Sequence, residues 1–333
     1  MGLYSSNRMM KMLIALSLLF SFSAAYAAGT EGHTLEKVEG QHDQDFRVFT
    51  VHKPVIMGIA ALRLMTSQTD LNLWLAGNQF FAMEKVIQQF QEKYPTVKSV
   101  GVITLPPGKE ADAILKGGWG YQGEKFSFEP DLYATVDMKP LQDFKTKGLA
   151  KTYFTYMHNE LTLMVRKGNP KAIKGIDDLK RKDLRIYLPN PLDEGIMSVY
   201  GRKVLTQHNL WDALVGSKGC KGCQVGNVYF TEVHHREIPK AVNEDKADVG
   251  LVWKTEVENA RRDGQKVEGI SLPVEDSLRK SVNYMATPLE KAKHVESLDS
   301  YVQFLKSDLA RTTYGEFGFI SATEEDVKTL AIP

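Results

Sequence analysis

The sequence is poor in cysteine and has no excess of either charge. Cys220 and Cys223 are its only cysteines, and 42 Lys and Arg residues face 41 Asp and Glu residues among 333 positions. Without a basic run or an aromatic-basic stripe, it offers no footprint for nucleic acid. The motifs G-x-S-x-G, H-E-x-x-H and G-x-x-x-x-G-K-[ST] are also missing, so the signals of a hydrolase, a zinc protease and an NTPase are absent. We therefore expect neither an enzyme nor a bound cofactor.

The two cysteines form a C-K-G-C pair. No His follows Cys223, which excludes haem attachment, and two cysteines cannot form a structural zinc site. A redox-active pair would need a helix starting at the first cysteine to lower its pKa, whereas the turn-like residues 224–227 follow here. We expect a local disulfide between Cys220 and Cys223, with an exported thiol-disulfide redox protein as an alternative.

Long apolar runs are also scarce, and the clearest one lies at the N-terminus. Arg8 and Lys11 precede an apolar run over residues 12–22, and Ala25-Tyr26-Ala27 has the small-x-small pattern of a cleavage site. The run is shorter than the roughly 20 residues that a membrane-spanning helix needs. Residues 1–27 are therefore predicted to be a signal peptide, cleaved near Ala27.

The richest pattern in the chain lies between residues 229 and 257. Residues 249–253, Val-Gly-Leu-Val-Trp, form a short apolar run typical of a buried strand. Pro239 before it suits the first turn of a helix, and Thr255 and Glu258 after it have the spacing of a capping box. Helix, buried strand and capped helix together predict an α/β protein.

From Asp70 onward the chain repeats a strand, a tight turn and a helix. Apolar residues alternate over 71–75 and then recur at helical spacing over 80–90. Further strands are predicted over 97–105, 130–136, 161–165, 184–188 and 282–286. The glycine-rich residues 117–123 are expected to form a loop. Residues 28–69 are interpreted as an N-terminal extension that packs along the surface of the body.

Three segments then suggest a family. Lys167-Gly168-Asn169-Pro170, residues 248–256 (D-V-G-L-V-W-K-T-E) and residues 314–319 (Y-G-E-F-G-F), in this order, resemble the periplasmic molybdate-binding proteins. The resemblance implies the two-lobed type II periplasmic binding fold, with a ligand cleft between the lobes. It also implies a periplasmic receptor, expected to be a monomer, that delivers a small solute to a membrane ABC permease. The lobes would comprise residues 70–160 with 272–333, and residues 161–271.

An oxyanion is held best by N–H groups at helix starts, and several strand-to-helix turns offer them. The resemblance extends to these turns and makes the ligand an oxyanion of the molybdate and tungstate class. Trp253 stands where the family commonly places a tyrosine. His235 is expected either to donate to the anion or, with Glu194, Glu232 or Glu237, to bind a divalent cation, so a receptor for a metal or a small carboxylate is the alternative. The candidate ligand-binding residues are Gly77, Asn78, Pro107, Gly108, Glu194, Gly195, His235 and Trp253.

Overall fold

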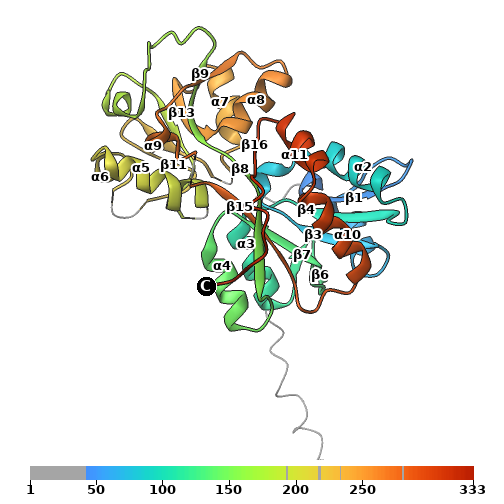
Figure 1. Ribbon diagram of the computed structural model, residues 1–333. Coiled ribbons are helices and arrows are strands. Elements are labelled where there is room, and N and C mark those ends of the chain that lie inside the picture. The colour runs from blue at the N-terminus through green and yellow to red at the C-terminus, as the bar shows by residue number, and fades with distance from the viewer. Residues whose placement is uncertain (1–42, 193, 217–218, 233, 280) are drawn as a thin grey trace, which may run out of the picture. The chain divides into compact units, whose positions relative to one another are not determined.

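The computed structural model describes residues 43–192, 194–216, 219–232, 234–279 and 281–333. The signal peptide predicted over residues 1–27 lies outside them. The described strands form a sheet of nine strands, a sheet of six and a two-stranded hairpin (Figure 1). We call the part of the chain built on the nine-stranded sheet the large lobe and the part built on the six-stranded sheet the small lobe.

The sheet of the large lobe has the order β16-β8-β15-β7-β3-β4-β1-β2, and β17 also pairs with β8. Strands β4, β3 and β7 run parallel as neighbours, so their carboxyl ends meet at one edge of the sheet. The strands are β1 (Phe46–Thr50), β2 (Ile56–Met57), β3 (Leu71–Trp74), β4 (Ser99–Ile103), β7 (Leu132–Thr135), β8 (Thr152–His158), β15 (Asn283–Pro288), β16 (Ile320–Ser321) and β17 (Leu330–Ala331). The helices are α1 (Gly58–Met65), α2 (Met83–Lys93), α3 (Pro107–Lys116), α4 (Met138–Thr146), α10 (Val295–Leu305) and α11 (Asp308–Gly315).

The sheet of the small lobe has the order β11-β12-β10-β13-β9-β14. Its middle strand β10 is parallel to β12 and to β13, which again brings three carboxyl ends to one edge. The strands are β9 (Leu161–Arg166), β10 (Ile186–Leu188), β11 (Cys223–Val225), β12 (Val228–Phe230), β13 (Val249–Trp253) and β14 (Val267–Ile270). The helices are α5 (Arg202–Gln207), α6 (Trp211–Leu214), α7 (Glu237–Asn243), α8 (Lys254–Arg262) and α9 (Val274–Ser277).

The chain passes between the two sheets twice. Residues 159–160 join β8 to β9, and residues 271–282 lead from β14 back to β15. Two α/β lobes connected in this way confirm the predicted two-lobed α/β fold.

The pattern around residues 229–257 predicted its elements well but one cap wrongly. The expected buried strand is β13, with all five residues buried, and the expected helix before it is α7. The capping box predicted at Thr255 and Glu258 is wrong. Helix α8 begins at Lys254, and Glu256 accepts a hydrogen bond of 3.3 Å from the backbone N–H of Trp253. A cap with the same three-residue spacing thus lies two residues earlier, between Trp253 and Glu256, because the strand runs directly into the helix.

Residues 28–69 do not form a surface extension where the structure describes them. Strand β1 pairs antiparallel with β4 over five residues, and Phe46 and Val48 are buried in the large lobe. Strand β1 was missed because it is short and carries Arg47 among its apolar residues. The loop predicted over residues 117–123 is also wrong in part, since β5 (Trp119–Tyr121) and β6 (Glu124–Phe126) form the hairpin there.

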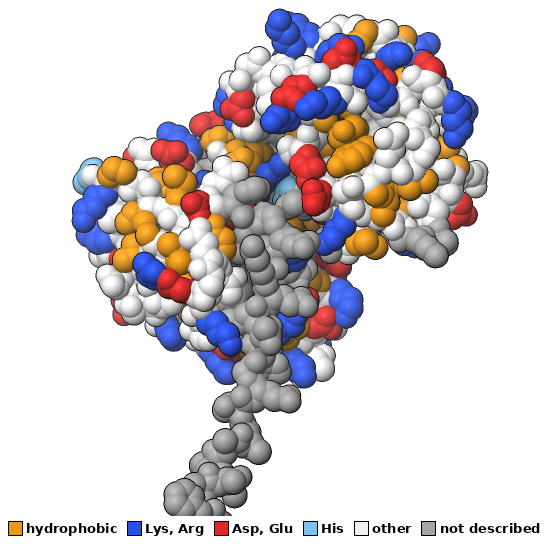
Figure 2. All heavy atoms as spheres, turned by 180° about the vertical axis from the view of Figure 1, so that it is seen from behind, with side chains coloured by type: hydrophobic (Ala, Val, Ile, Leu, Met, Phe, Trp, Pro, Cys, Tyr) orange, Lys and Arg blue, Asp and Glu red, His pale blue; other side chains and the backbone are white. Residues whose placement is uncertain are grey.

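The surface agrees with the balanced composition. On the face drawn in Figure 2, acidic and basic side chains are interspersed. Among the residues that the structure describes, no helix combines the length and apolar character that a membrane span requires.

Candidate functional site

A cavity of about 230 Å³ lies where loops of both lobes meet. All eight residues proposed from the sequence line it: Gly77, Asn78, Pro107, Gly108, Glu194, Gly195, His235 and Trp253. The cavity is also lined by residues outside this proposed set, among them His234, Thr135, Asp137, Leu192 and Ser198. The structure therefore gathers the proposed residues around one space.

The wall from the large lobe is made of turns that follow parallel strands. Gly77 and Asn78 open a 3-10 turn, η2 (Gly77–Gln79), after β3, and Pro107 and Gly108 open α3 after β4. Backbone N–H groups in a first helical turn lack intrahelical partners and carry partial positive charge. Pro107 has no N–H, so Gly108 is the first donor of α3. A Cβ added at Gly108 would meet no atom within 4 Å.

The wall from the small lobe comes from the carboxyl ends of its own parallel strands. Glu194 and Gly195 follow β10 and precede a π-helical turn, η4 (Ile196–Gly201). His235 lies after β12, and Trp253 is the last residue of β13. Because these three strands are adjacent, residues far apart in the sequence face the same cavity.

His235 is held between two carboxylates of its own lobe. Its Nδ1 contacts the carboxylate of Glu194, and its Nε2 lies 2.5 Å from Oε1 of Glu256. Its backbone N–H also donates to Glu194 Oε2 at 2.9 Å. Burial alone would lower the pKa of His235, but Glu256 and Glu194 together raise it to about 9. At neutral pH the ring is therefore an imidazolium flanked by two buried carboxylates.

This arrangement changes the role expected of His235. Both ring nitrogens are directed at Glu194 and Glu256, so neither is placed to donate to a solute. Thr231 also donates to Glu194, through its hydroxyl at 3.0 Å. His235 thus compensates the charge of two buried carboxylates and fixes the Glu194 carboxylate, while Glu256 is a member of the site that the sequence did not reveal.

The side chains of Asn78 and Trp253 are engaged in packing and hydrogen bonding. The amide of Asn78 donates to the hydroxyl of Tyr284. The ring of Trp253 meets that of Tyr200 edge-on at 5.4 Å between centroids, and the Tyr200 hydroxyl donates to the carbonyl of Val136 in the other lobe. Trp253 therefore stands beside a contact that joins the two lobes.

Within the described residues, Glu194, His234 and His235 form a group with metal-ligand chemistry. Their ligand atoms lie within 4.8 Å of one another, and nitrogen and oxygen ligands of this kind suit divalent cations. His234 Nδ1 lies 3.9 Å from Glu194 Oε2 and accepts a hydrogen bond of 3.2 Å from the backbone N–H of Arg236. To ligate a cation, His235 would first have to lose the proton that it shares with the carboxylates.

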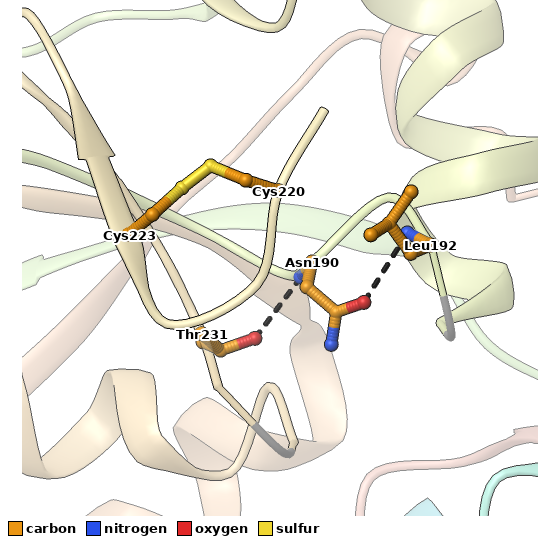
Figure 3. Close-up of a disulfide and its surroundings, with 5 residues drawn as sticks. All are labelled: Asn190, Leu192, Cys220, Cys223 and Thr231. Carbon is orange, nitrogen blue, oxygen red and sulfur yellow. Dashed lines mark hydrogen bonds between the residues drawn. A yellow bond between two sulfur atoms is a disulfide. The ribbon is translucent and has the colours of Figure 1, made fainter. Parts of the chain in front are cut away.

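Cys220 and Cys223 form a disulfide beside the loop that borders the cavity (Figure 3). In this loop Asn190 donates its backbone N–H to the Thr231 hydroxyl at 3.0 Å and accepts one from Leu192 at 3.2 Å. Strand β11 begins at Cys223, and the described residues around the pair have no helix starting at Cys220. The feature that lowers the pKa of a redox-active cysteine is thus missing there.

Two α/β lobes, joined by two crossings and enclosing a small cavity at the ends of their parallel strands, define a solute-binding receptor of the periplasmic class. The chain matches the bacterial extracellular solute-binding protein family over residues 71–320, and it belongs to that family. Solute-binding proteins of ABC importers bind small solutes, rather than catalyse reactions, and deliver them to membrane permeases. The resemblance predicted from the sequence is confirmed at this level.

Individual relatives are distant. The sulfate-binding protein of Synechococcus elongatus is 27% identical over 172 residues, which are 50% of this chain and 48% of that protein. The match thus spans about half the length of this curated relative. The periplasmic molybdate-binding protein of Azotobacter vinelandii has a TM-score of 0.59 at 16% identity, covering 76% of this chain and 100% of that one. The sulfate-binding protein SubI of Mycobacterium tuberculosis has a TM-score of 0.52 at 17% identity, covering 77% and 88%. At these identities the solved structures show the fold alone.

Proposed function

We propose that this protein is a periplasmic receptor that captures a small oxyanion of the molybdate and tungstate class and delivers it to an ABC permease. The large lobe, with β1 and β2 as part of its sheet, would close against the small lobe, and the receptor would act as a monomer. The observation that carries the proposal is the convergence of strand-to-helix turns from both lobes on one cavity. The names of the molybdate- and sulfate-binding relatives support the same class of ligand.

The size of the cavity supports a small ligand. A volume of about 230 Å³ is the space of roughly eight water molecules at about 30 Å³ each. A tetrahedral anion with a few bound waters fits this space. First-turn N–H groups such as that of Gly108 can donate to such an anion without any charged side chain.

A panel of thermal melts tests the proposal. Molybdate, tungstate, sulfate and phosphate would be compared with divalent cations and small carboxylates. A solute that binds only the folded state at 100 times its dissociation constant stabilises it by about 2.7 kcal/mol. We expect a rise in melting temperature with at least one tetrahedral oxyanion. The absence of a shift with all four would disprove this ligand class.

The variant Gly108→Asp links such a shift to the cavity. A Cβ added at this position meets no atom within 4 Å, and the dipole of α3 favours an acidic residue in its first turn. The carboxylate would nevertheless repel an anion in the cavity. We expect unchanged or slightly higher stability without ligand, together with loss of the oxyanion-induced shift. Gly175→Asp, which also meets open space but lies outside the cavity lining, should bind like the wild type.

A receptor for a divalent cation is the second candidate, favoured by the grouping of Glu194, His234 and His235. Its affinity would rise with pH, because the cation must displace the His235 proton. A melting shift with a divalent cation, lost in His234→Asn but kept in Gly108→Asp, would establish this candidate and replace the oxyanion proposal.

A further inference from the structure

Arg236 belongs to the small lobe but makes its contacts with the large lobe. It directly precedes α7, and one of its terminal nitrogens donates to the carbonyl of Gly77 and, at 3.3 Å, to that of Thr104. The other terminal nitrogen lies 3.1 Å from Asp45 Oδ1. The guanidinium also stacks over the ring of Phe80, at 4.1 Å from its centroid. One side chain therefore connects the lobes through an ion pair, two carbonyl groups and an aromatic ring.

The two carbonyl groups belong to the turns that line the cavity. Gly77 opens η2, and Thr104 lies between β4 and the start of α3. The approach is close, because a Cβ added to Gly77 would lie 3.0 Å from His234 Nε2 and 3.2 Å from an Arg236 terminal nitrogen. Arg236 thus fixes the positions of both turns only when the small lobe is against them.

Asp45 compensates the positive charges of Arg236 and of a second arginine near it. Arg47 of β1 also lies over the Phe80 ring, at 5.9 Å, so two guanidinium groups share one aromatic ring. Burial and then the neighbouring Arg236 lower the pKa of Arg47 to about 10, while Asp45 acts in the opposite direction. Asp45 is only 3% exposed. Without its carboxylate, bringing the lobes together would set two partly buried cations beside each other.

We propose that Arg236 is a closure residue, meaning a residue that stabilises the approach of the lobes and positions the two ligand-facing turns, and that Asp45 is its required partner. The proposal rests on the proposed function in one respect, since it assumes that the lobes close over a solute. It assigns a role to residues 43–50, which lie before the region matched by the family. When Arg236 or Asp45 is lost, a smaller fraction of the molecules is in the closed form. The apparent affinity for the solute falls in proportion to the population of the closed form.

The experiment is a double-mutant cycle with Asp45→Asn, Arg236→Gln and the combined variant. Lobe separation is measured without ligand, by the distance distribution between spin labels on cysteines introduced at the exposed Lys147 and Lys240. Dissociation of the solute found in the melting panel gives the second readout. Arg202→Gln is the matched control, because Arg202 stacks over Trp211 at 4.3 Å within the small lobe.

We expect each single variant to shift the distances to longer values and to speed solute release about tenfold, the effect of a 1.4 kcal/mol loss. The combined variant should be no worse than either single one, and Arg202→Gln should match the wild type. Arg236→Lys keeps the charge but offers one nitrogen in place of a planar fork, so it cannot hold Asp45 and the two carbonyl groups from two nitrogens while stacking on Phe80. It should keep short distances and still release solute faster. The proposal would be overturned if the effects of Asp45→Asn and Arg236→Gln on solute release added up in the combined variant. It would also be overturned if the folded variants kept the wild-type distances between the spin labels. If the wild type binds no solute, the proposed function fails, while the distance measurement still decides the role of Arg236.

Discussion

At the scale of single residues, His235 makes stability depend on pH. Its pKa is about 9 in the folded protein, above the 6.5 of a histidine in an unfolded chain. A group whose pKa rises on folding stabilises the protein fully below the unfolded value and loses this effect as the pH passes the folded value. The shift corresponds to a contribution on the order of 3 kcal/mol. This contribution should fade between about pH 6.5 and pH 9.

The measurement is urea unfolding at a series of pH values for the wild type and His235→Gln. The variant should be less stable at pH 6.5, because two buried carboxylates lose the cation between them, and its stability should fall less toward pH 9. His52→Asn, at an exposed turn with positive φ, is the control and should keep the wild-type slope. If the free energy of unfolding of His235→Gln and of the wild type fell equally with pH, the His235 imidazolium would not be the source of the pH dependence.

The sequence pointed to His235 but not to its environment. The pattern placed it between strands at the end of an element, which is where the structure has it. Glu194 and Glu256, however, lie 41 positions before it and 21 positions after it, and no local spacing signals that they flank its ring. These two distant neighbours determine that His235 is a structural imidazolium and not a donor to the ligand.

At the scale of elements, the packing of α7 on β13 leaves no room for a side chain at Gly250. A Cβ there would lie 2.2 Å from Cγ2 of Ile238 and 3.2 Å from the carbonyl oxygen of Tyr187. Ile238 is fully buried and cannot move aside cheaply. We expect Gly250→Ala to lower the free energy of unfolding by about 1–3 kcal/mol, the usual cost of overpacking.

Chemical denaturation of Gly250→Ala tests this packing against Gly315→Ala. The second glycine ends α11, and an added Cβ would meet nothing within 4 Å. The same change should therefore be neutral or slightly stabilising at Gly315. A Gly250→Ala protein as stable as the wild type would mean that α7 can shift away from β13.

Element boundaries were predictable where hydrophobic periodicity was strong. Strand β13 and helix α7 follow directly from an apolar run and a proline at the helix start. Strand β1 did not, because Arg47 interrupts a five-residue segment whose only long-range signal is its pairing with β4. A short strand such as β1, which lies before the repeated strand-helix units, is defined by its pairing with a distant strand. The local sequence pattern does not contain this information.

At the scale of the whole molecule, the family resemblance implied two lobes, and the pattern of strand-helix units located the turns that border the cavity. Each turn is a local feature, and parallel strands bring their carboxyl ends together by topology. The contacts that join the lobes are not local. Asp45 and Arg236 are 191 positions apart, so their pairing was visible only in three dimensions.

The region matched by the family, residues 71–320, should not be stable without β1. A chain starting at residue 52 would lose Phe46, Val48 and Phe49, which are 0%, 1% and 6% exposed, and would leave one edge of β4 unpaired. Burying such side chains contributes on the order of 5 kcal/mol, comparable to a net stability of roughly 5–15 kcal/mol. An unpaired edge also favours aggregation. Compared with a chain starting at Asp43, the shorter chain should be unfolded or aggregated by circular dichroism and size-exclusion chromatography. Equal unfolding midpoints for the two chains would show that β1 is dispensable for the fold.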